Sequence, residues 1–374
     1  MITIRYRGAR RTSLKRLSGE PVSPECRRRG AGYTVCPVTD SAADPVLIRA
    51  ENYLGHITLN RPRQINALTL EMIHSVQEAL ASWADDPRIT AVLIDGAGDR
   101  GLCAGGDIRL LYEGLTGIAP APAEFWSDEY RMNSTLAHYP KPIVSYMTGI
   151  TLGGGIGISA HCSVRIVTES SQVGMPETAI GLCPDVGGLY LLSRSPGELG
   201  THAALTGARF GPADAIAAGL ADHFVPAAGL TGLTEQLRQG IVPNVGRATA
   251  SDGELAGQSW IDECYFGDDI ASILAALGAR PEAAAVQAAQ LLATMSPTAL
   301  KVTLRAIRQA ATMSLDEVLD QDFRVGTRFL RKPDLQEGIR ARIIDKDRQP
   351  RWNPATLAEV SDADVAAFFE PLDA

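Results

Sequence analysis

Residues 89–107 read "ITAVLIDGAGDRGLCAGGD". The first half is a continuous apolar run of strand length, which is typical of a strand buried on both faces. The second half ends in the glycine-rich turn "GLCAGGD" (residues 101–107), where glycine lets the backbone approach a neighbouring segment or a ligand closely. A buried strand that runs into such a turn, with helical sequence on either side, indicates an α/β fold.

The sequence before this segment predicts two strands and a helix. Residues 46–60, "VLIRAENYLGHITLN", alternate β-branched and aromatic residues around a turn at 52–55, which favours two short strands. Residues 69–85, "TLEMIHSVQEALASWAD", carry apolar residues at helical spacing, with Thr69 placed as the N-cap. We therefore expect ordered structure to begin near Val46.

The sequence after this segment repeats the pattern. Helical sequence continues through Tyr139, and a second strand, "PIVSYMTG" (142–149), leads into a glycine turn, a short helix and the strand "SVRIVT" (163–168). Strands that alternate with helices stack their crossovers on one core. We expect this α/β core at residues 45–225.

Beyond the core the sequence is helical, so residues 226–374 are predicted to form a helical C-terminal region. The last short strand is expected within "ADHFVP" (221–226). The alanine-rich stretch is interpreted as helix and not as low-complexity sequence. Helices are expected at 274–295, 296–311, 314–330 and 335–346.

The composition is that of an ordinary soluble globular protein with an uneven charge. The 374 residues are 45% hydrophobic and 21% charged, with a formal net charge of −8. Residues 1–44 hold nine Lys and Arg against four Asp and Glu, so the remainder carries about −13. An acidic body argues against nucleic acid as a partner, because phosphate binding needs a cationic face. We expect residues 1–44 to be a disordered basic extension.

Cysteine spacing and the length of apolar runs indicate the compartment. The six cysteines form no CxxC pair, which fits reduced thiols in a cytosol-like environment. No run approaches the roughly 18 apolar residues of a membrane span. The Arg-rich N-terminus lacks the apolar stretch of a secretory signal. We expect a cytoplasmic protein without a membrane partner, or a mitochondrial matrix protein if the source is eukaryotic.

Three glycine-rich turns follow predicted strands, at residues 101–107, 149–157 ("GITLGGGIG") and 184–188 ("PDVGG"). The N–H groups of two such turns, aimed at one point, would form an oxyanion hole. The plainer interpretation, that these glycines only allow tight turns, stays open for each. "GIGISA" at 155–160 also fits a dinucleotide-binding fingerprint, but the next strand begins too soon for the crossover of about 10–12 residues that the motif needs.

Two acids stand among apolar residues in "MPETAIGLCPDVGG", residues 175–188. A carboxylate in an apolar pocket has a raised pKa, which suits Glu177 and Asp185 to general acid–base catalysis. The alternatives are an acid at a helix start for Glu177 and a turn residue for Asp185. The chain has no G-x-S-x-G elbow, no HExxH and no paired metal-ligand spacing, so neither a serine-triad hydrolase nor a metal site is expected.

Together these motifs resemble the crotonase (enoyl-CoA hydratase/isomerase) superfamily, and most closely its 3-hydroxyisobutyryl-CoA hydrolase branch. The resemblance covers about residues 45–360. It rests on an ordered set of motifs: "NRPRQINAL", "GLCAGGDIRLLYEG", "GITLGGGIGIS", "MPETAIGLCPDVGG", "LTGARF" and "SPTALKVTLR … DFRVGTRFL … EGIRARIIDKDRQPRW". It implies a crotonase-like spiral of ββα units with a helical C-terminal region, and a coenzyme A thioester bound in a cleft.

The resemblance also implies a site. Two backbone N–H groups bind the thioester oxygen, and by position in the motifs these belong to Ala104 and Gly154. Glu177 matches the second of two hydratase glutamates, whereas the first is replaced by Gly157. Asp185 stands where hydratases carry a small residue, as in the hydrolase branch. Further substrate contacts are implied for Glu129, Gly105, Gly106 and Asp107.

The activity implied is hydrolysis of a short 3-hydroxyacyl-CoA thioester, with 3-hydroxyisobutyryl-CoA of valine catabolism as the branch substrate. Coenzyme A is then part of the substrate, and no cofactor is expected. The alternatives are an enoyl-CoA hydratase or isomerase that uses Glu177 alone, and a non-catalytic relative that binds acyl-CoA. For Glu129 the alternative is a solvated helix acid. The family often forms trimers, but the helical tail could cover that surface, so a homo-oligomer and a single chain both stay open.

Overall fold

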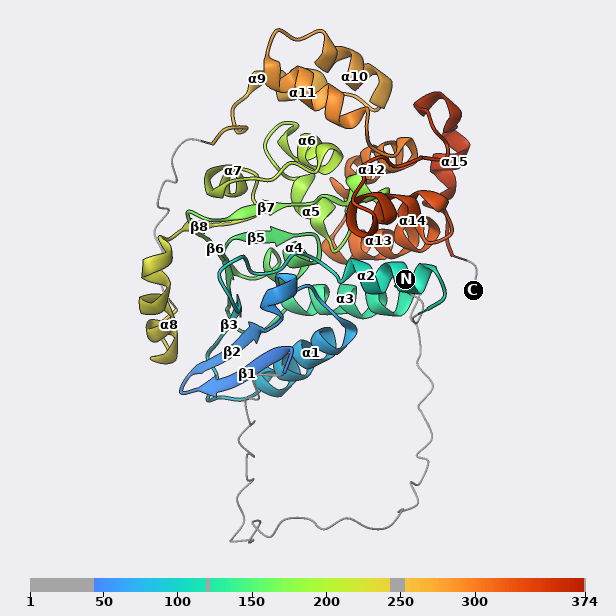
Figure 1. Ribbon diagram of the computed structural model, residues 1–374. Coiled ribbons are helices and arrows are strands. Elements are labelled where there is room, and N and C mark those ends of the chain that lie inside the picture. The colour runs from blue at the N-terminus through green and yellow to red at the C-terminus, as the bar shows by residue number, and fades with distance from the viewer. Residues whose placement is uncertain (1–43, 119–121, 243–252, 373–374) are drawn as a thin grey trace, which may run out of the picture. The chain divides into compact units, whose positions relative to one another are not determined.

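The computed structural model describes residues 44–118, 122–242 and 253–372 (Figure 1). The predicted basic extension, residues 1–44, lies outside the described residues except for Asp44. All the described residues belong to one compact unit. The change expected near residue 225 is therefore a change from strands to helices within one body.

A six-stranded sheet lies at the centre, in the order β1-β2-β3-β4-β6-β8. β1 (Val46–Glu51) and β2 (Leu54–Leu59) form an antiparallel hairpin, and every later neighbour pairs in parallel. β2 is buried along its whole length, and the first four residues of β3 are buried, as the apolar run there predicts. The remaining strands of this sheet are β3 (Ala91–Gly96), β4 (Ile143–Met147), β6 (Val164–Val167) and β8 (His223–Phe224).

Helices connect the parallel strands. α1 (Leu70–Ala84) joins β2 to β3, and its N-cap Thr69 accepts a hydrogen bond from the Met72 N–H, as its sequence predicts. α2 (Ile108–Leu115) and α3 (Pro122–Ala137) lie between β3 and β4, and α3 packs against α1. These connections have the alternating pattern expected from the sequence.

The connection from β4 to β6 corrects one sequence argument. It spans residues 148–163 and includes β5 (Ile150–Leu152) and α4 (Gly154–Ser159). This crossover is long enough for the parallel pairing, so crossover length does not exclude a dinucleotide fingerprint at residues 155–160. The position of its glycines argues against one, because Gly155 and Gly157 lie inside α4 and not in the turn before it.

A second, two-stranded sheet stacks the glycine turns. β5 pairs in parallel with β7 (Gln172–Gly174), and the first glycine turn joins them through bridges from Gly101 to Gly149 and from Cys103 to Thr151. An added Cβ on Gly155 would lie 2.4 Å from the Cys103 carbonyl oxygen, so only glycine permits this contact. The stacking brings two glycine turns that are about 50 residues apart in the sequence into one place.

The C-terminal helices pack onto the segment that holds the two predicted acids. A 3-10 turn, Glu177–Ile180, precedes α5 (Gly188–Leu192), and α12, α13 and α14 pack on these elements and on α3 (Figure 1). No described helix is both long and apolar enough to cross a membrane. The helices are α6 (Leu199–Thr206), α7 (Pro212–Ala217), α8 (Leu230–Arg238), α9 (Ser259–Tyr265), α10 (Ile270–Gly278), α11 (Ala283–Leu292), α12 (Pro297–Ala310), α13 (Leu315–Phe329), α14 (Pro333–Ile339) and α15 (Asp362–Ala367).

Candidate active site

Four carboxyl side chains from distant parts of the sequence are buried together, and we call them the carboxylate cluster. Glu129 comes from α3, Glu177 opens the 3-10 turn, Asp185 lies in the loop before α5 and Asp322 comes from α13. They are 2%, 7%, 8% and 3% exposed. Acids are rarely buried at this level unless they are paired, so the cluster calls for an explanation.

Burial raises the pKa values of all four carboxyl groups, and repulsion by neighbouring acids raises those of Glu129, Glu177 and Asp322 further. The pKa of Glu129 is raised well above its ordinary value by burial and by the charges of Asp185 and Glu177. The pKa of Glu177 is raised mainly by burial and then by Asp185. Burial raises the pKa of Asp185 to about 6 and also raises that of Asp322. The cluster can therefore hold and move protons near neutral pH.

Two backbone N–H groups lie beside the cluster without a partner. An added Cβ on Gly154 would lie 3.2 Å from the Gly106 nitrogen, and one on Gly105 would lie 3.6 Å from the Gly154 nitrogen. Within the described residues, neither the Gly106 nor the Gly154 N–H donates a hydrogen bond. Adjacent N–H groups left free in this way are the donors that an oxyanion hole requires.

The prediction that the Ala104 N–H is a donor of the oxyanion hole is wrong. Its N–H donates to the Ile65 carbonyl oxygen at 2.9 Å, which holds the turn in place and leaves no proton for a ligand. The free donor on this turn lies two residues further on, at Gly106. The motif located the correct turn, but sequence alone did not reveal which of its amides the backbone uses.

Two acids of the cluster reach this pair of amides. The Glu129 Oε1 atom lies 2.5 Å from the position of a Cβ on Gly154, and the Glu177 Oε1 atom lies 2.6 Å from that of a Cβ on Gly153. Any larger residue at either glycine would displace a carboxyl group. Glu129 Oε1 and Glu177 Oε2 are buried with no hydrogen-bond partner, so each acid has an oxygen free for a ligand. The burial of Glu129 rules out a solvated helix acid.

The other two acids are hydrogen-bonded. The Tyr130 hydroxyl donates to Asp185 Oδ2 at 2.6 Å, and the Gly187 N–H donates to Asp322 Oδ2 at 2.8 Å. Sequence reasoning missed Tyr130 and Asp322 as site residues. A buried polar residue on the apolar face of an amphipathic helix is the signal that could have identified Asp322.

The position of the missing hydratase glutamate is filled by other side chains. An added Cβ on Gly157 would lie 2.8 Å from both Asn133 Nδ2 and Val186 Cβ. Asn133 is fully buried and both of its polar side-chain atoms lack a partner. A glutamate therefore has no room at residue 157, and no acid of the described chain replaces it there.

The Asp107 carboxylate is held by contacts within the protein. Its carboxylate caps α2 by accepting the Arg109 and Leu110 N–H groups, and it forms an ion pair with Arg61 at 2.9 Å. These contacts give it a structural role in the turn, and the substrate contact that the resemblance implies for it stays a prediction. Among the described residues no group of His, Cys, Asp and Glu could hold a metal ion.

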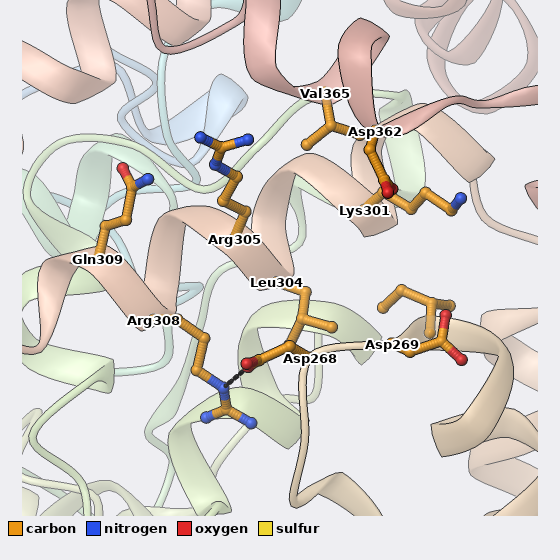
Figure 2. Close-up of a pocket in the computed structure, with 10 residues that line it drawn as sticks. Asp268, Asp269, Lys301, Leu304, Arg305, Arg308, Gln309, Asp362 and Val365 are labelled. Atoms are coloured by element: carbon orange, nitrogen blue, oxygen red, sulfur yellow. Dashed lines mark hydrogen bonds and ion pairs between the residues drawn. The ribbon is translucent and has the colours of Figure 1, made fainter.

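A separate cavity of about 390 Å³ lies against α12, and we call it the outer cavity (Figure 2). Arg308 pairs there with Asp268 at 3.2 Å, and the Lys301 ammonium donates to the Val360 carbonyl oxygen at 2.7 Å. Its charged lining residues are Lys301, Arg305, Arg308, Asp268, Asp269 and Asp362. All three of its cations already contact protein groups, since Arg305 lies over the Phe369 ring, and it contains none of the predicted catalytic residues.

Comparison with known proteins places this arrangement among coenzyme A enzymes. A model of the enoyl-CoA hydratase/isomerase family matches residues 54–369. The chain is 38% identical over 352 residues to a mitochondrial 3-hydroxyisobutyryl-CoA hydrolase of Gallus gallus, covering 90% of this chain and 91% of that protein. It is 37% identical to the protein of that name from Homo sapiens, covering 88% and 90%.

Two solved structures are similar in fold and sequence. One is a carnitinyl-CoA dehydratase from Mycobacterium thermoresistibile, with a TM-score of 0.85 and 49% identity over 88% of this chain and 97% of that one. The other is an enoyl-CoA hydratase from Rhodobacter sphaeroides, with a TM-score of 0.84 and 44% identity over 88% and 98%. The relatives therefore carry names from two reaction types, cleavage of a thioester and addition or removal of water.

Proposed function

The chain belongs to the enoyl-CoA hydratase/isomerase family, and we propose that within it the protein hydrolyses a short 3-hydroxyacyl-CoA thioester, with 3-hydroxyisobutyryl-CoA as the first candidate. One observation carries the choice of reaction. The first hydratase glutamate is absent, and Asn133 and Val186 occupy its space at Gly157. Asp185 is instead added to the site, where burial raises its pKa to about 6.

The proposed oxyanion hole consists of the Gly106 and Gly154 N–H groups. They hold the thioester carbonyl oxygen and stabilise the negative charge that develops on it when the carbonyl carbon is attacked. Removing one such donor typically raises the barrier by about 3 kcal/mol. The free Glu129 Oε1 atom lies next to Gly154, and the Glu177 Oε1 atom lies next to Gly153, which supports a carbonyl carbon bound within reach of both acids.

Glu177 is proposed as the group that starts the reaction. It either takes a proton from an attacking water or attacks the carbonyl carbon itself and forms a mixed anhydride that water then cleaves. Both routes consume one water and yield a carboxylic acid and free coenzyme A. In a quenched single turnover, only the second route adds the mass of the acyl group to the enzyme.

Asp185 is proposed to deliver the proton that the leaving thiolate needs, or to bind the 3-hydroxyl group of the substrate. Its pKa of about 6 keeps a protonated fraction present near neutral pH, which suits proton donation. Glu129, whose Oε1 has no protein partner, is proposed as a further substrate contact. The proposed role in valine catabolism follows from this substrate, and the cytoplasmic location expected from the sequence stays a prediction.

The alternative is an enoyl-CoA hydratase, which the names of the two similar solved structures favour. A panel of acyl-CoA thioesters that includes 3-hydroxyisobutyryl-CoA and 3-hydroxypropionyl-CoA separates the two. We expect free coenzyme A, followed with a thiol reagent, to appear from at least one 3-hydroxyacyl thioester. Loss of enoyl absorbance without coenzyme A release would favour the hydratase, and intact thioesters after long incubation would favour a protein that only binds them.

A further inference from the structure

The turn that carries Asp185 has a backbone conformation that its sequence disfavours. Val186 has a φ of +52°, and Gly187 follows with +71°. The left-handed region is rare for a β-branched residue, since Cβ then crowds the backbone. Such a conformation persists only where the surroundings hold it. The turn therefore needs an external support.

Two buried side chains provide contacts to this turn. His161, which follows α4, donates from Nε2 to the Val186 carbonyl oxygen at 2.8 Å. Asp322, from α13, accepts the Gly187 N–H at 2.8 Å. Both side chains are less than a tenth exposed. Both contacts therefore hold the single peptide group between Val186 and Gly187, His161 through its carbonyl oxygen and Asp322 through its N–H.

The histidine contact persists at neutral pH. Burial lowers the pKa of His161 to about 4, so its ring is neutral and carries one proton. A carbonyl oxygen only accepts, so that proton lies on Nε2. The ring therefore acts as a fixed donor at any pH where the enzyme would work.

We propose that His161 and Asp322 are positioning residues, which hold the turn of residues 185–187 so that the Asp185 carboxyl group meets the Tyr130 hydroxyl inside the carboxylate cluster. The inference rests on the proposed function, since it assigns the two side chains to the reaction through Asp185. In this structure the Tyr130 hydroxyl lies 2.6 Å from Asp185 Oδ2. That distance is the quantity that the two supports control.

The first test compares variants that remove a contact with variants that keep it. His161→Leu and Asp322→Leu lose the hydrogen bond, whereas His161→Gln keeps a donor and Asp322→Asn keeps an acceptor. We expect the leucine variants to lower kcat by about 10–100-fold, as misplacement of a reacting group by about 1 Å does, with KM changed less than about threefold. The Gln and Asn variants should recover most of kcat. Equal losses in both sets would overturn the proposal.

A second test asks whether the supports act through Asp185. Each leucine variant is combined with Asp185→Asn, and kcat is compared in a double-mutant cycle. The proposal predicts no further loss of kcat in the Asp185→Asn background. Losses that multiply would show that the supports act elsewhere. If a leucine variant does not fold, the alanine variant at the same position takes its place in the cycle.

Matched control variants measure how the loss of a buried polar contact elsewhere in the protein changes stability and kcat. His202 is also buried and binds the Tyr265 hydroxyl at 2.9 Å, and Asp214 is buried and accepts the Ala256 N–H at 2.8 Å. Neither touches the turn. His202→Leu and Asp214→Leu should lower the melting temperature while kcat stays within about twofold. A loss of kcat equal to that of the turn variants would contradict a specific role.

Crystal structures of the variants test the inference without relying on turnover. In His161→Leu and Asp322→Leu we expect the contact between Tyr130 and Asp185 to lengthen beyond hydrogen-bond distance, about 3.5 Å. An unchanged contact would overturn the inference even if kcat were low. If the wild-type protein releases no coenzyme A from any thioester, the proposed function fails, and these distances still decide whether the supports hold the turn.

Discussion

The carboxylate cluster and the outer cavity both contain several charged side chains. Opposite charges are paired in the outer cavity, whereas acids alone are buried together in the cluster. In the outer cavity the cation of Arg308 faces Asp268 at 3.2 Å (Figure 2), and outside the cavity lining it also pairs with Glu198 at 2.8 Å. The cluster places four acids together, and their pKa values are raised by burial and, for Glu129, Glu177 and Asp322, by neighbouring acids, with no cation among the causes.

This difference indicates a structural role for the outer cavity and a chemical role for the carboxylate cluster. Paired charges at a partly exposed site lose little solvation and contribute little to the free energy of unfolding, typically about 0–1 kcal/mol for each pair. Buried acids of one sign raise each other's pKa values and destabilise the fold unless protons remain bound. A protein keeps such a cluster where its proton-binding groups are used.

The largest effect is expected from Glu177→Gln, which removes the reacting carboxyl group and keeps its size. The rate of coenzyme A release should fall by about 100–10,000-fold, the usual range for loss of a general base. The melting temperature should not fall, because the change removes one of the buried repelling charges. Steady-state kinetics and thermal melts measure both. Activity near that of the wild type would remove Glu177 from the mechanism.

Asp185 should give the folded protein a distinctive dependence on pH. Its pKa is about 6 in the folded state and 3.8 ordinarily, so between these values the folded state binds a proton that the unfolded state does not. The stabilisation is fully present below the ordinary value and is lost as pH rises through about 6. The loss from this group is at most about 3 kcal/mol.

Chemical denaturation between pH 4 and 8 measures this dependence. Asp185→Asn should flatten the decline in the free energy of unfolding and should be more stable than the wild type at pH 8. A variant with the same pH dependence as the wild type would mean that the Asp185 charge is compensated in the folded protein.

Gly157→Glu tests whether the first hydratase glutamate, which is absent here, can simply be restored. The new Cβ meets Asn133 Nδ2 and Val186 Cβ at 2.8 Å, so overpacking should cost about 1–3 kcal/mol of stability. Hydration of an enoyl-CoA should not appear. Thermal melts and enoyl absorbance provide the readouts, and a stable variant with hydratase activity would show that the site is a hydratase lacking one residue.

The smallest effect is expected in the outer cavity. Asp268→Asn removes one acid beside Arg308, which keeps Glu198 as a partner. Stability should change by less than about 0.5 kcal/mol, and kcat by less than twofold. A tenfold loss of activity would mean that the outer cavity takes part in the reaction and that the contrast with the cluster is false.

Much of the fold was predictable because its signals are local. The buried run at β3, the Thr69 cap of α1 and the Ser-Pro start of α12 each depend on neighbouring residues only. The family motifs located the glycine turns. Glu177 and Asp185 were identified because apolar residues flank both acids in the sequence. Both lie in the carboxylate cluster.

The parts that were missed depend on contacts between distant segments. Ala104 and Gly106 are equally plausible donors in the sequence, and only the Ile65 carbonyl, which binds one of them, separates the two. Asp322 lies 135 residues beyond the turn that it contacts. The resemblance implied a substrate contact for Asp107, whereas its observed contacts are with the start of α2 and with Arg61.

The ratio of two rates measured on one preparation decides whether the site cleaves thioesters or hydrates enoyl-CoA. Coenzyme A release from 3-hydroxyisobutyryl-CoA is compared with hydration of the corresponding α,β-unsaturated thioester, for the wild type and for Asp185→Asn. We predict that thioester cleavage exceeds hydration by at least about 100-fold in kcat/KM, and that Asp185→Asn reduces this ratio. Hydration as fast as cleavage, with a ratio that Asp185→Asn leaves unchanged, would contradict the assignment of the carboxylate cluster to thioester hydrolysis.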